Sequence, residues 1–191
     1  RNVYKLFNDL IAAYKEPAKK EVAEIEKEFY KDLKKEEFQP WDFSFYSHKL
    51  QLKRYNIDAE MLRPYFELSK VIDGIFGLAN RLYGITFKEN KDIPVYHPDV
   101  KAYEVFDKDG SYLAVFYADF HPRKGKQGGA WMTEYQGQWM ERIDTKKPFS
   151  PENAKNIRPH VSVVMNLTKP TAEKPALLTL SEVETFLHEF G

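Results

Sequence analysis

The sequence lacks cysteine, long apolar runs and an excess of charge of either sign, and each absence excludes a class of protein. Without cysteine, the chain has neither a disulfide framework nor thiolate ligands for a metal ion, which fits a reducing compartment. Because no run of about 18 apolar residues is present, the sequence predicts no membrane-spanning helix. The 29 basic and 29 acidic side chains cancel, which gives no indication of a nucleic acid or a strongly charged partner.

The residues that are present suffice for a folded core. The chain has 191 residues, a usual length for one domain, of which 42% are hydrophobic and 15% aromatic. It begins at Arg1 in the middle of a helical pattern, without methionine or a signal sequence, so the absence of a targeting peptide says nothing about location. We expect a cytoplasmic protein, with the periplasm as the alternative.

The first 84 residues are expected to be mainly helical. From residue 2 to about residue 37, apolar side chains recur every three or four positions, which predicts a long amphipathic helix with one face toward a core. Pro17 is expected to kink or split this helix after Tyr14, because proline lacks an amide donor. Three further helices are predicted, at about 43–55, from an N-cap at Asp58 to Arg63, and at about 68–82 with Gly84 as the C-terminal cap.

After residue 84 the apolar pattern changes to a period of two, the period of a strand. Short strands are expected at 85–87 and at about 160–168. Segments 101–107 and 112–119 predict an antiparallel hairpin, because Gly110 can adopt the left-handed conformation of a short turn. The segment 120–158 is rich in glycine and proline and has little periodicity, so we expect a long connection, usually functional or disordered.

Residues 181–191 predict a final helix. Ser181 and Glu184 fit a capping box, in which each side chain accepts a hydrogen bond from the backbone amide of the other residue. At ~100° per residue, His188 and Glu189 fall on the face opposite an apolar stripe. The stripe that should face the core consists of Val183, Phe186, Leu187 and Phe190.

The end of this helix carries the main functional signal. His188-Glu189-Phe190-Gly191 fills the first four positions of the motif H-E-x-x-H. The motif places two imidazoles on one helix face, where both bind one Zn²⁺, and its glutamate takes a proton from the water that the zinc activates. A histidine after Gly191 would make this chain part of a metallopeptidase. The alternative, from these four residues alone, is an ordinary imidazole on a helix surface.

Other residues that commonly carry chemistry receive structural interpretations. Glycine, lysine and glutamine at 125–127 do not form a phosphate loop, since Ser or Thr does not follow the lysine. The remaining histidines lack the spacing of a ligand pair, so we expect structural or solvated roles for His48, His97, His121 and His160.

A set of segments lies in a fixed order along the chain. The segments are RPYFEL (63–68), LYGITF (82–87), PVYHPDV (94–100), EVFD (104–107), FYAD (116–119), then Arg123, Gly125 and Lys126, GGAWM (128–132), NLTKP (166–170), PALLTL (175–180) and FLHEFG (186–191). Taken together in this order, they resemble the thimet-oligopeptidase family of zinc metallopeptidases, and most of all its bacterial peptidyl-dipeptidase (dipeptidyl carboxypeptidase) branch. The resemblance covers residues 60–191 well and residues 1–59 more loosely.

The resemblance implies a mostly helical fold with a deep channel, a small sheet beside the active site and a zinc helix on the channel wall. His188 matches the first zinc ligand and Glu189 the general base. The other ligands, and the groups that steady the tetrahedral intermediate, would lie beyond Gly191. The strand near 161–166 and four residues of the glycine-containing segment match the region that holds substrate backbone, where a peptide could add as an extra strand. These four are Gly128, Gly129, Ala130 and Trp131.

We therefore predict a helix-rich α+β fold. A mainly helical part (1–84) would precede a small antiparallel or mixed sheet with a long glycine-containing loop (85–180), followed by the start of the zinc helix (181–191). The parent protein would be a zinc-dependent oligopeptidase or peptidyl-dipeptidase, whose partners are short peptide substrates and the missing C-terminal part of the same protein. Because one imidazole does not hold zinc, we expect this chain alone to bind no Zn²⁺ tightly and to be inactive.

Two alternatives remain open. One is a non-enzymatic α+β module that binds peptides or partner helices through a sheet edge or through the N-terminal helical stripe. The other is a pseudo-enzyme whose parent lacks the second histidine. The residue after Gly191 distinguishes these alternatives from a peptidase.

Overall fold

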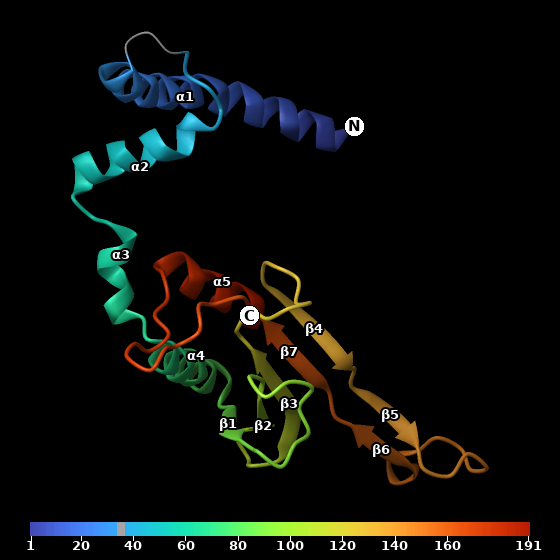
Figure 1. Cartoon of the computed structure of the whole chain (residues 1–191). Helices are drawn as coiled ribbons and strands as arrows, with labels where there is room; N and C mark the ends of the chain where they lie inside the picture. The colour runs from blue at the N-terminus through green and yellow to red at the C-terminus, as the bar shows by residue number, and fades with distance from the viewer. Residues whose placement is uncertain (34–36) are drawn as a thin grey trace. The chain divides into compact units, whose positions relative to one another are not determined.

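The computed structural model describes residues 1–33 and 37–191, which form two compact units, Arg1–Asp58 and Ala59–Gly191 (Figure 1). The first unit consists of helices α1 (Asn2–Asp32) and α2 (Asp42–Tyr55). Its core is a small aromatic cluster in which the ring of Phe29 lies 5.2 Å from that of Tyr46 and 5.3 Å from that of Phe38. The second unit contains the sheet and the remaining helices.

Helix α1 corrects two expectations. It runs through Pro17 without a break, so the predicted split is wrong. Alanines at positions 12, 13 and 18 favour the helix on both sides of the proline, and only one amide donor is lost. The predicted stripe is buried only near Ile25 and Phe29, because α2, with 14 residues against 31, covers only part of α1. The last predicted turn, at 34–36, lies outside the described residues.

The helices of the second unit follow the predicted pattern. Helix α3 (Ala59–Leu62) comes directly after Asp58 and continues into a short 3₁₀ turn (Arg63–Tyr65). Helix α4 (Leu68–Tyr83) ends at Gly84, whose φ of 77° is the left-handed C-terminal cap that the sequence predicted. Helix α5 (Leu180–Phe190) closes the chain.

The main sheet has five strands in the order β1-β2-β3-β7-β4. Strands β3 and β7 are parallel and the other neighbours antiparallel, which makes the sheet mixed. The hairpin predicted at 101–119 is present, with Gly110 at a φ of 81° in its turn. The strands are β1 (Thr86–Glu89), β2 (Lys101–Phe106), β3 (Tyr112–Asp119), β4 (Trp131–Gln136) and β7 (His160–Val164).

The segment 120–158, expected to lack regular structure, contains three strands. Strand β4 lies at the edge of the main sheet, and β5 (Trp139–Arg142) pairs with β6 (Ala154–Ile157) in a separate two-stranded ribbon. Figure 1 shows this ribbon continuing outward from β4 and β7. Each side chain of β5 is exposed, so a core-facing alternation, which would have marked these strands in the sequence, is missing.

Helices α4 and α5 pack against the same face of the main sheet. Phe76 of α4 stacks on Phe87 with 4.0 Å between ring centroids, and Phe190 of α5 lies 5.6 Å from Phe116. The opposite face of the sheet carries a smaller apolar cluster around Val115 and Tyr117. The fold is thus α+β and helix-rich, as predicted.

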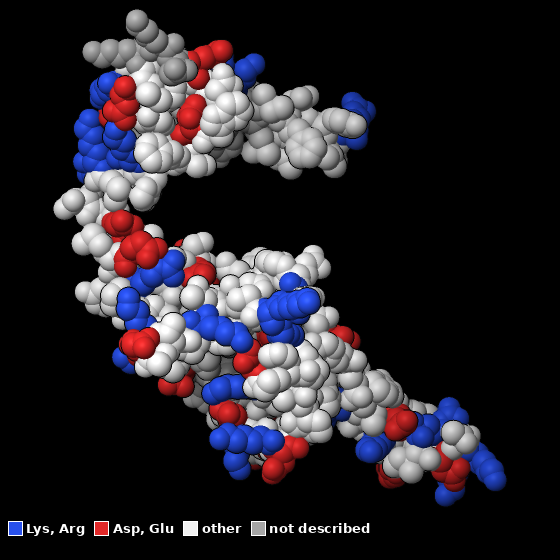
Figure 2. Space-filling model, viewed as in Figure 1, with Lys and Arg blue, Asp and Glu red and all other residues white. Residues whose placement is uncertain are grey.

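Among the described residues, no helix combines the length and the apolar character needed to cross a membrane. On the face that Figure 2 shows, acidic and basic side chains are interleaved over the β5–β6 ribbon. This interleaving agrees with the equal numbers of acidic and basic residues in the sequence.

Candidate active site

Helix α5 begins with a capping box, two residues earlier than predicted. The Thr179 hydroxyl accepts a hydrogen bond from the Glu182 amide at 3.1 Å, and the Glu182 carboxylate accepts one from the Thr179 amide at 2.7 Å. The predicted box of Ser181 and Glu184 is wrong because Ser181 already lies inside the helix. Arg63 stabilises the segment just before α5, since its guanidinium donates a hydrogen bond to the Leu177 carbonyl at 3.1 Å.

The apolar stripe of α5 packs as predicted, with one exception. Phe186 has 0% of its surface exposed, and its ring lies 4.8 Å from that of Phe120. Leu187, expected in the core, is 40% exposed and lines an apolar hollow of about 230 Å³ together with Leu78 of α4. The sheet thus accommodates only part of the stripe, because Leu187 points toward α4 and the sheet lies under Phe186 and Phe190.

The two candidate catalytic residues lie on the polar side of α5. His188 is exposed, and Glu189 is half-buried. The Glu189 carboxylate accepts a hydrogen bond from the backbone amide of Met132 at 2.9 Å. Residues 57 positions apart in the sequence therefore meet, and the carboxylate lies at the edge of strand β4.

Within the described part of the chain, strand β4 has a strand neighbour on one side only, since its pairing partner in the main sheet is β7. Trp131 opens this edge strand, and Ala130, Gly129 and Gly128 precede it. Gly129 has a φ of 93°, a conformation that favours glycine. Of the four residues predicted to hold substrate backbone, Trp131 is thus in the edge strand beside Glu189, and the other three form the loop that leads into it.

The sequence predicts one zinc ligand in this chain, His188. Among the described residues, no group of three or more His, Asp or Glu side chains could hold a metal ion. His97 and His121 take part in local contacts: the Asp99 amide donates to His97 Nδ1 at 3.2 Å, and His121 Nδ1 lies 3.1 Å from the Leu167 carbonyl. His188 would therefore supply one ligand, and the others would have to come from elsewhere.

Sequence reasoning missed a buried charge cluster behind the candidate site. Asp119, at the end of β3, is 2% exposed and accepts two hydrogen bonds from the Arg123 guanidinium, at 2.7 and 2.9 Å. Lys126 Nζ and the Tyr96 hydroxyl donate to the same carboxylate, each at 2.9 Å. An acidic residue within the apolar run 113–120 was the available signal, because a buried carboxylate requires a partner.

The environment of Asp119 lowers its pKa. Burial by itself raises the pKa, but hydrogen bonds from Arg123, Lys126 and Tyr96 outweigh it and bring the pKa from an ordinary 3.8 to about 2. The pKa of Lys126 is also lowered, because the burial of the ammonium outweighs the effect of Asp119. The carboxylate is charged at neutral pH and belongs to a paired cluster.

This depressed pKa predicts a pH dependence of stability. The contribution of Asp119 is fully present above the unfolded-state pKa near 3.8 and is lost as the pH falls toward about 2. We expect the free energy of unfolding to fall by up to about 2 kcal/mol over that window through Asp119 alone. Urea unfolding of Asp119→Asn should show a lower free energy at pH 7 and a weaker fall between pH 4 and 2.

The matched control for this prediction is Asp73→Asn, which changes an exposed aspartate on α4. Its acid transition should follow that of the unsubstituted chain. An unchanged acid transition in Asp119→Asn would contradict the assigned role of the cluster.

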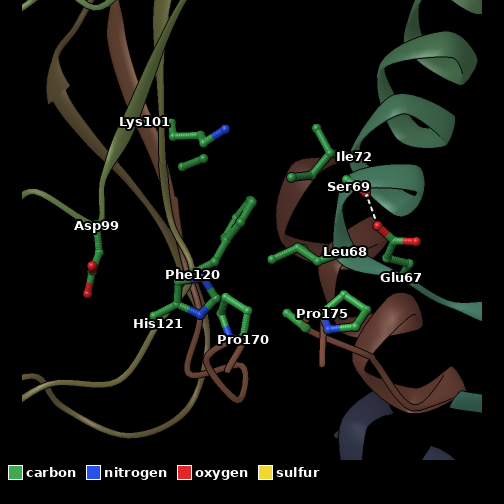
Figure 3. Close-up of a pocket in the computed structure, with 12 residues that line it drawn as sticks. Glu67, Leu68, Ser69, Ile72, Asp99, Lys101, Phe120, His121, Pro170 and Pro175 are labelled. Atoms are coloured by element: carbon green, nitrogen blue, oxygen red, sulfur yellow. Dashed lines mark hydrogen bonds between the residues drawn. The ribbon is translucent and has the colours of Figure 1, made fainter. Parts of the chain in front are cut away.

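A separate pocket of about 220 Å³ lies between α4, the sheet and the segment that precedes α5 (Figure 3). Leu68 and Ile72 of α4 form an apolar wall on one side in Figure 3. Asp99, Lys101 and His121 lie on the other side, with Phe120 next to His121. The lining includes neither His188 nor Glu189, nor any of residues 128–131. This pocket is therefore distinct from the candidate active site.

This chain is similar in sequence to known peptidases. The chain is 40% identical to "Dipeptidyl carboxypeptidase" of Escherichia coli (strain K12) over 184 residues, which are 96% of this chain and 25% of that protein. It is 37% identical to "Oligopeptidase A" of the same organism over 191 residues, all of this chain and 27% of that protein. It is 44% identical over 154 residues to "Dipeptidyl carboxypeptidase" of Salmonella typhimurium (strain LT2), with 80% of this chain and 21% of that protein covered.

The chain thus spans about a quarter of the length of the curated relatives that it matches over most of its own length. A family model described as "Peptidase family M3" matches residues 1–191. These similarities cover both units of the structure, including α5 with His188 and Glu189. The chain therefore belongs to peptidase family M3, on its dipeptidyl carboxypeptidase branch.

Proposed function

We propose that this chain forms the part of a zinc-dependent peptidase that supplies the general base, one metal ligand and the strand edge for the substrate. The observation that carries the proposal is the hydrogen bond from the Met132 amide to the Glu189 carboxylate. It holds a potential proton acceptor at the edge of β4, which has no strand neighbour on that side. A peptide that adds to this edge would lie beside the carboxylate.

In this mechanism each residue of the chain has a separate task. Zinc, when bound, would polarise water and the peptide carbonyl, and His188 would be one of its ligands. Glu189 would accept the proton of the attacking water and transfer it to the leaving amine. Gly128 and Gly129 would let the peptide backbone approach β4, because they carry no side chain there. The proposed substrates are short peptides.

The family membership supports peptidase activity, and the finer assignments depend on residues outside this chain. A second imidazole after Gly191, and a further ligand, would complete the metal site. By itself the chain is expected to bind Zn²⁺ weakly and to leave peptides intact. The proposed catalytic domain would consist of a mainly helical part (1–84), a sheet part with a long glycine-containing loop (85–180) and the start of the zinc helix (181–191).

The direct test uses a longer polypeptide that continues past Gly191. We expect it to hydrolyse a fluorogenic peptide, to lose activity with a zinc chelator and to regain activity when Zn²⁺ is restored. His188→Ala should weaken zinc binding by at least about 100-fold, measured by calorimetry, since a ligand matters at least as much as the groups around it. His48→Ala changes an exposed histidine of the first unit and should leave zinc binding unchanged.

The exposed edge of β4 also favours a second candidate, a peptide-binding module without catalysis. The same experiment separates the two functions. Binding of an extended peptide without cleavage, unaffected by chelator, would support the module and contradict the peptidase. Mass spectrometry of the products would show whether dipeptides leave from the carboxyl end.

A further inference from the structure

The contact between Glu189 and Met132 depends on how strand β4 begins. The loop from Phe120 to Ala130 joins the buried strand β3 to β4 at the sheet edge. Its glycines Gly125 and Gly129 have φ values of 83° and 93°, so side chains are disfavoured at both positions. A loop of this composition needs fixed contacts to hold the first residues of β4 in one place.

Lys126 provides the first set of contacts. Its side chain is 3% exposed and points back under the loop. Its ammonium group donates to the carboxylate and carbonyl of Asp119 and to the carbonyl of His121, each at 2.9 Å, and to the carbonyl of Met165. An ammonium has three donor hydrogens for these four acceptors, so each hydrogen is used and one is shared between two oxygens. The lysine thereby ties the loop to the ends of β3 and β7.

Asn166 provides the second set from the opposite direction. It lies two residues after the end of β7, and its side-chain amide donates to the carbonyls of Gln127 and Gly129, at 2.9 and 2.8 Å. Two backbone positions in the last turn of the loop are therefore held by one side chain. Met132 follows Gly129 by three residues, and its amide is the one that donates to Glu189.

We infer that Lys126 and Asn166 are positioning residues that hold the start of β4 so that the Met132 amide stays against the Glu189 carboxylate. Asn166 contacts only backbone carbonyls of the loop, and Lys126 contacts backbone carbonyls at the ends of β3 and β7 together with the Asp119 carboxylate. Lys126 anchors the middle of the loop and Asn166 its end. The inference rests on the proposed function only where it concerns catalysis, because the contact itself can be measured without metal or substrate.

The test follows amide hydrogen exchange at Met132 by NMR in the full chain. In the unsubstituted chain this amide should be protected, although it points away from β7. Glu189→Ala should remove the protection, which would establish that it reports the contact. In Lys126→Met and in Asn166→Asp, exchange at Met132 should be about tenfold faster, because a net hydrogen bond contributes a factor of this order.

Two controls separate positioning from a general loss of structure. Lys124→Met removes an exposed lysine of the same loop and should leave exchange at Met132 unchanged. Val163, in the middle of the sheet between β3 and β4, should keep its protection in each variant. If Lys126→Met unfolds the sheet, Asn166→Asp decides, because it preserves the size of the side chain and replaces the donor by a carboxylate oxygen, which repels the two carbonyls that the amide bound.

Unchanged protection of Met132 in a folded Asn166→Asp variant would overturn the inference, as would a loss that spreads equally to Val163. In an active longer polypeptide, the same variants should lower kcat with little change in KM, since they displace a group that acts on the reacting water. If these variants lose the protection of the Met132 amide but the longer polypeptide shows no peptidase activity, the positioning role is supported and only the proposed function is contradicted.

Discussion

Glu189→Gln is expected to lower kcat for peptide hydrolysis by about 10³-fold in an active polypeptide that contains α5, in line with the 10²–10⁴-fold that general bases contribute. Glutamine has nearly the same size, and its carbonyl oxygen can still accept the hydrogen bond that the Met132 amide donates. It cannot accept the proton of water. The substitution therefore removes the proposed chemistry and preserves the observed contact.

Steady-state kinetics with a fluorogenic peptide would measure this loss, and zinc content would be determined in the same samples. Glu184→Gln, which changes an exposed carboxylate on the same helix, should retain the activity. Glu189→Gln with normal kcat would exclude Glu189 as the general base. Loss of zinc in that variant would instead assign the effect to the metal site.

Phe186→Ala is expected to lower the free energy of unfolding of the second unit by about 3–5 kcal/mol. The side chain has 0% of its surface exposed and packs between α5 and the sheet, with its ring 4.8 Å from that of Phe120 and 6.2 Å from that of Phe190. Alanine would leave a cavity that these rigid rings cannot fill. This loss is comparable to a large part of the stability of an ordinary domain.

Urea unfolding should be followed in a Trp41→Phe background, because the two remaining tryptophans, Trp131 and Trp139, both belong to the second unit. Phe186→Leu serves as the matched variant, since it keeps most of the apolar volume and should cost less than half as much. A loss below about 1 kcal/mol in Phe186→Ala would show that α5 is not held by this side chain.

The sequence predicted those elements that carry their own boundary signals. Helix α4 shows a repeating apolar stripe and a glycine at its end, and the hairpin of β2 and β3 has Gly110 in its turn. Strand β4 was missed because its side chains alternate only weakly between half-buried and exposed, as expected at a sheet edge. The apolar alternation that marks a strand in a sequence arises from burial of one face, and an edge strand is buried only in part.

The N-terminus of α5 could not be placed from the local sequence pattern. Thr179 with Glu182 and Ser181 with Glu184 both satisfy the spacing of a capping box, so the sequence contains two equivalent starts. Contacts from the distant Arg63, to the Leu177 carbonyl and to Glu182, favour the earlier one. Local sequence cannot contain that information, because the arginine lies more than 100 positions away.

The candidate site was predicted in part. The motif indicated His188 and Glu189, and the resemblance indicated the residues before Met132. That Met132 donates to Glu189 depends on tertiary packing, as does the convergence of Lys126 and Asn166 on one loop. From the sequence alone, a lysine in a glycine-containing loop is expected at the surface. Lys126 is buried because it pairs with the buried Asp119, which the sequence pattern does not show.

The parallel pairing of β3 with β7 has a consequence for the order in which the second unit folds. Its register joins Val115 to His160 across 45 intervening steps of chain, whereas β1, β2 and β3 form a meander of near neighbours. Closing so long a segment costs conformational entropy before stabilising contacts form, so this pairing is slow. The meander should therefore assemble early on the nascent chain, and β7, with the edge strand β4 that faces Glu189, should be added last.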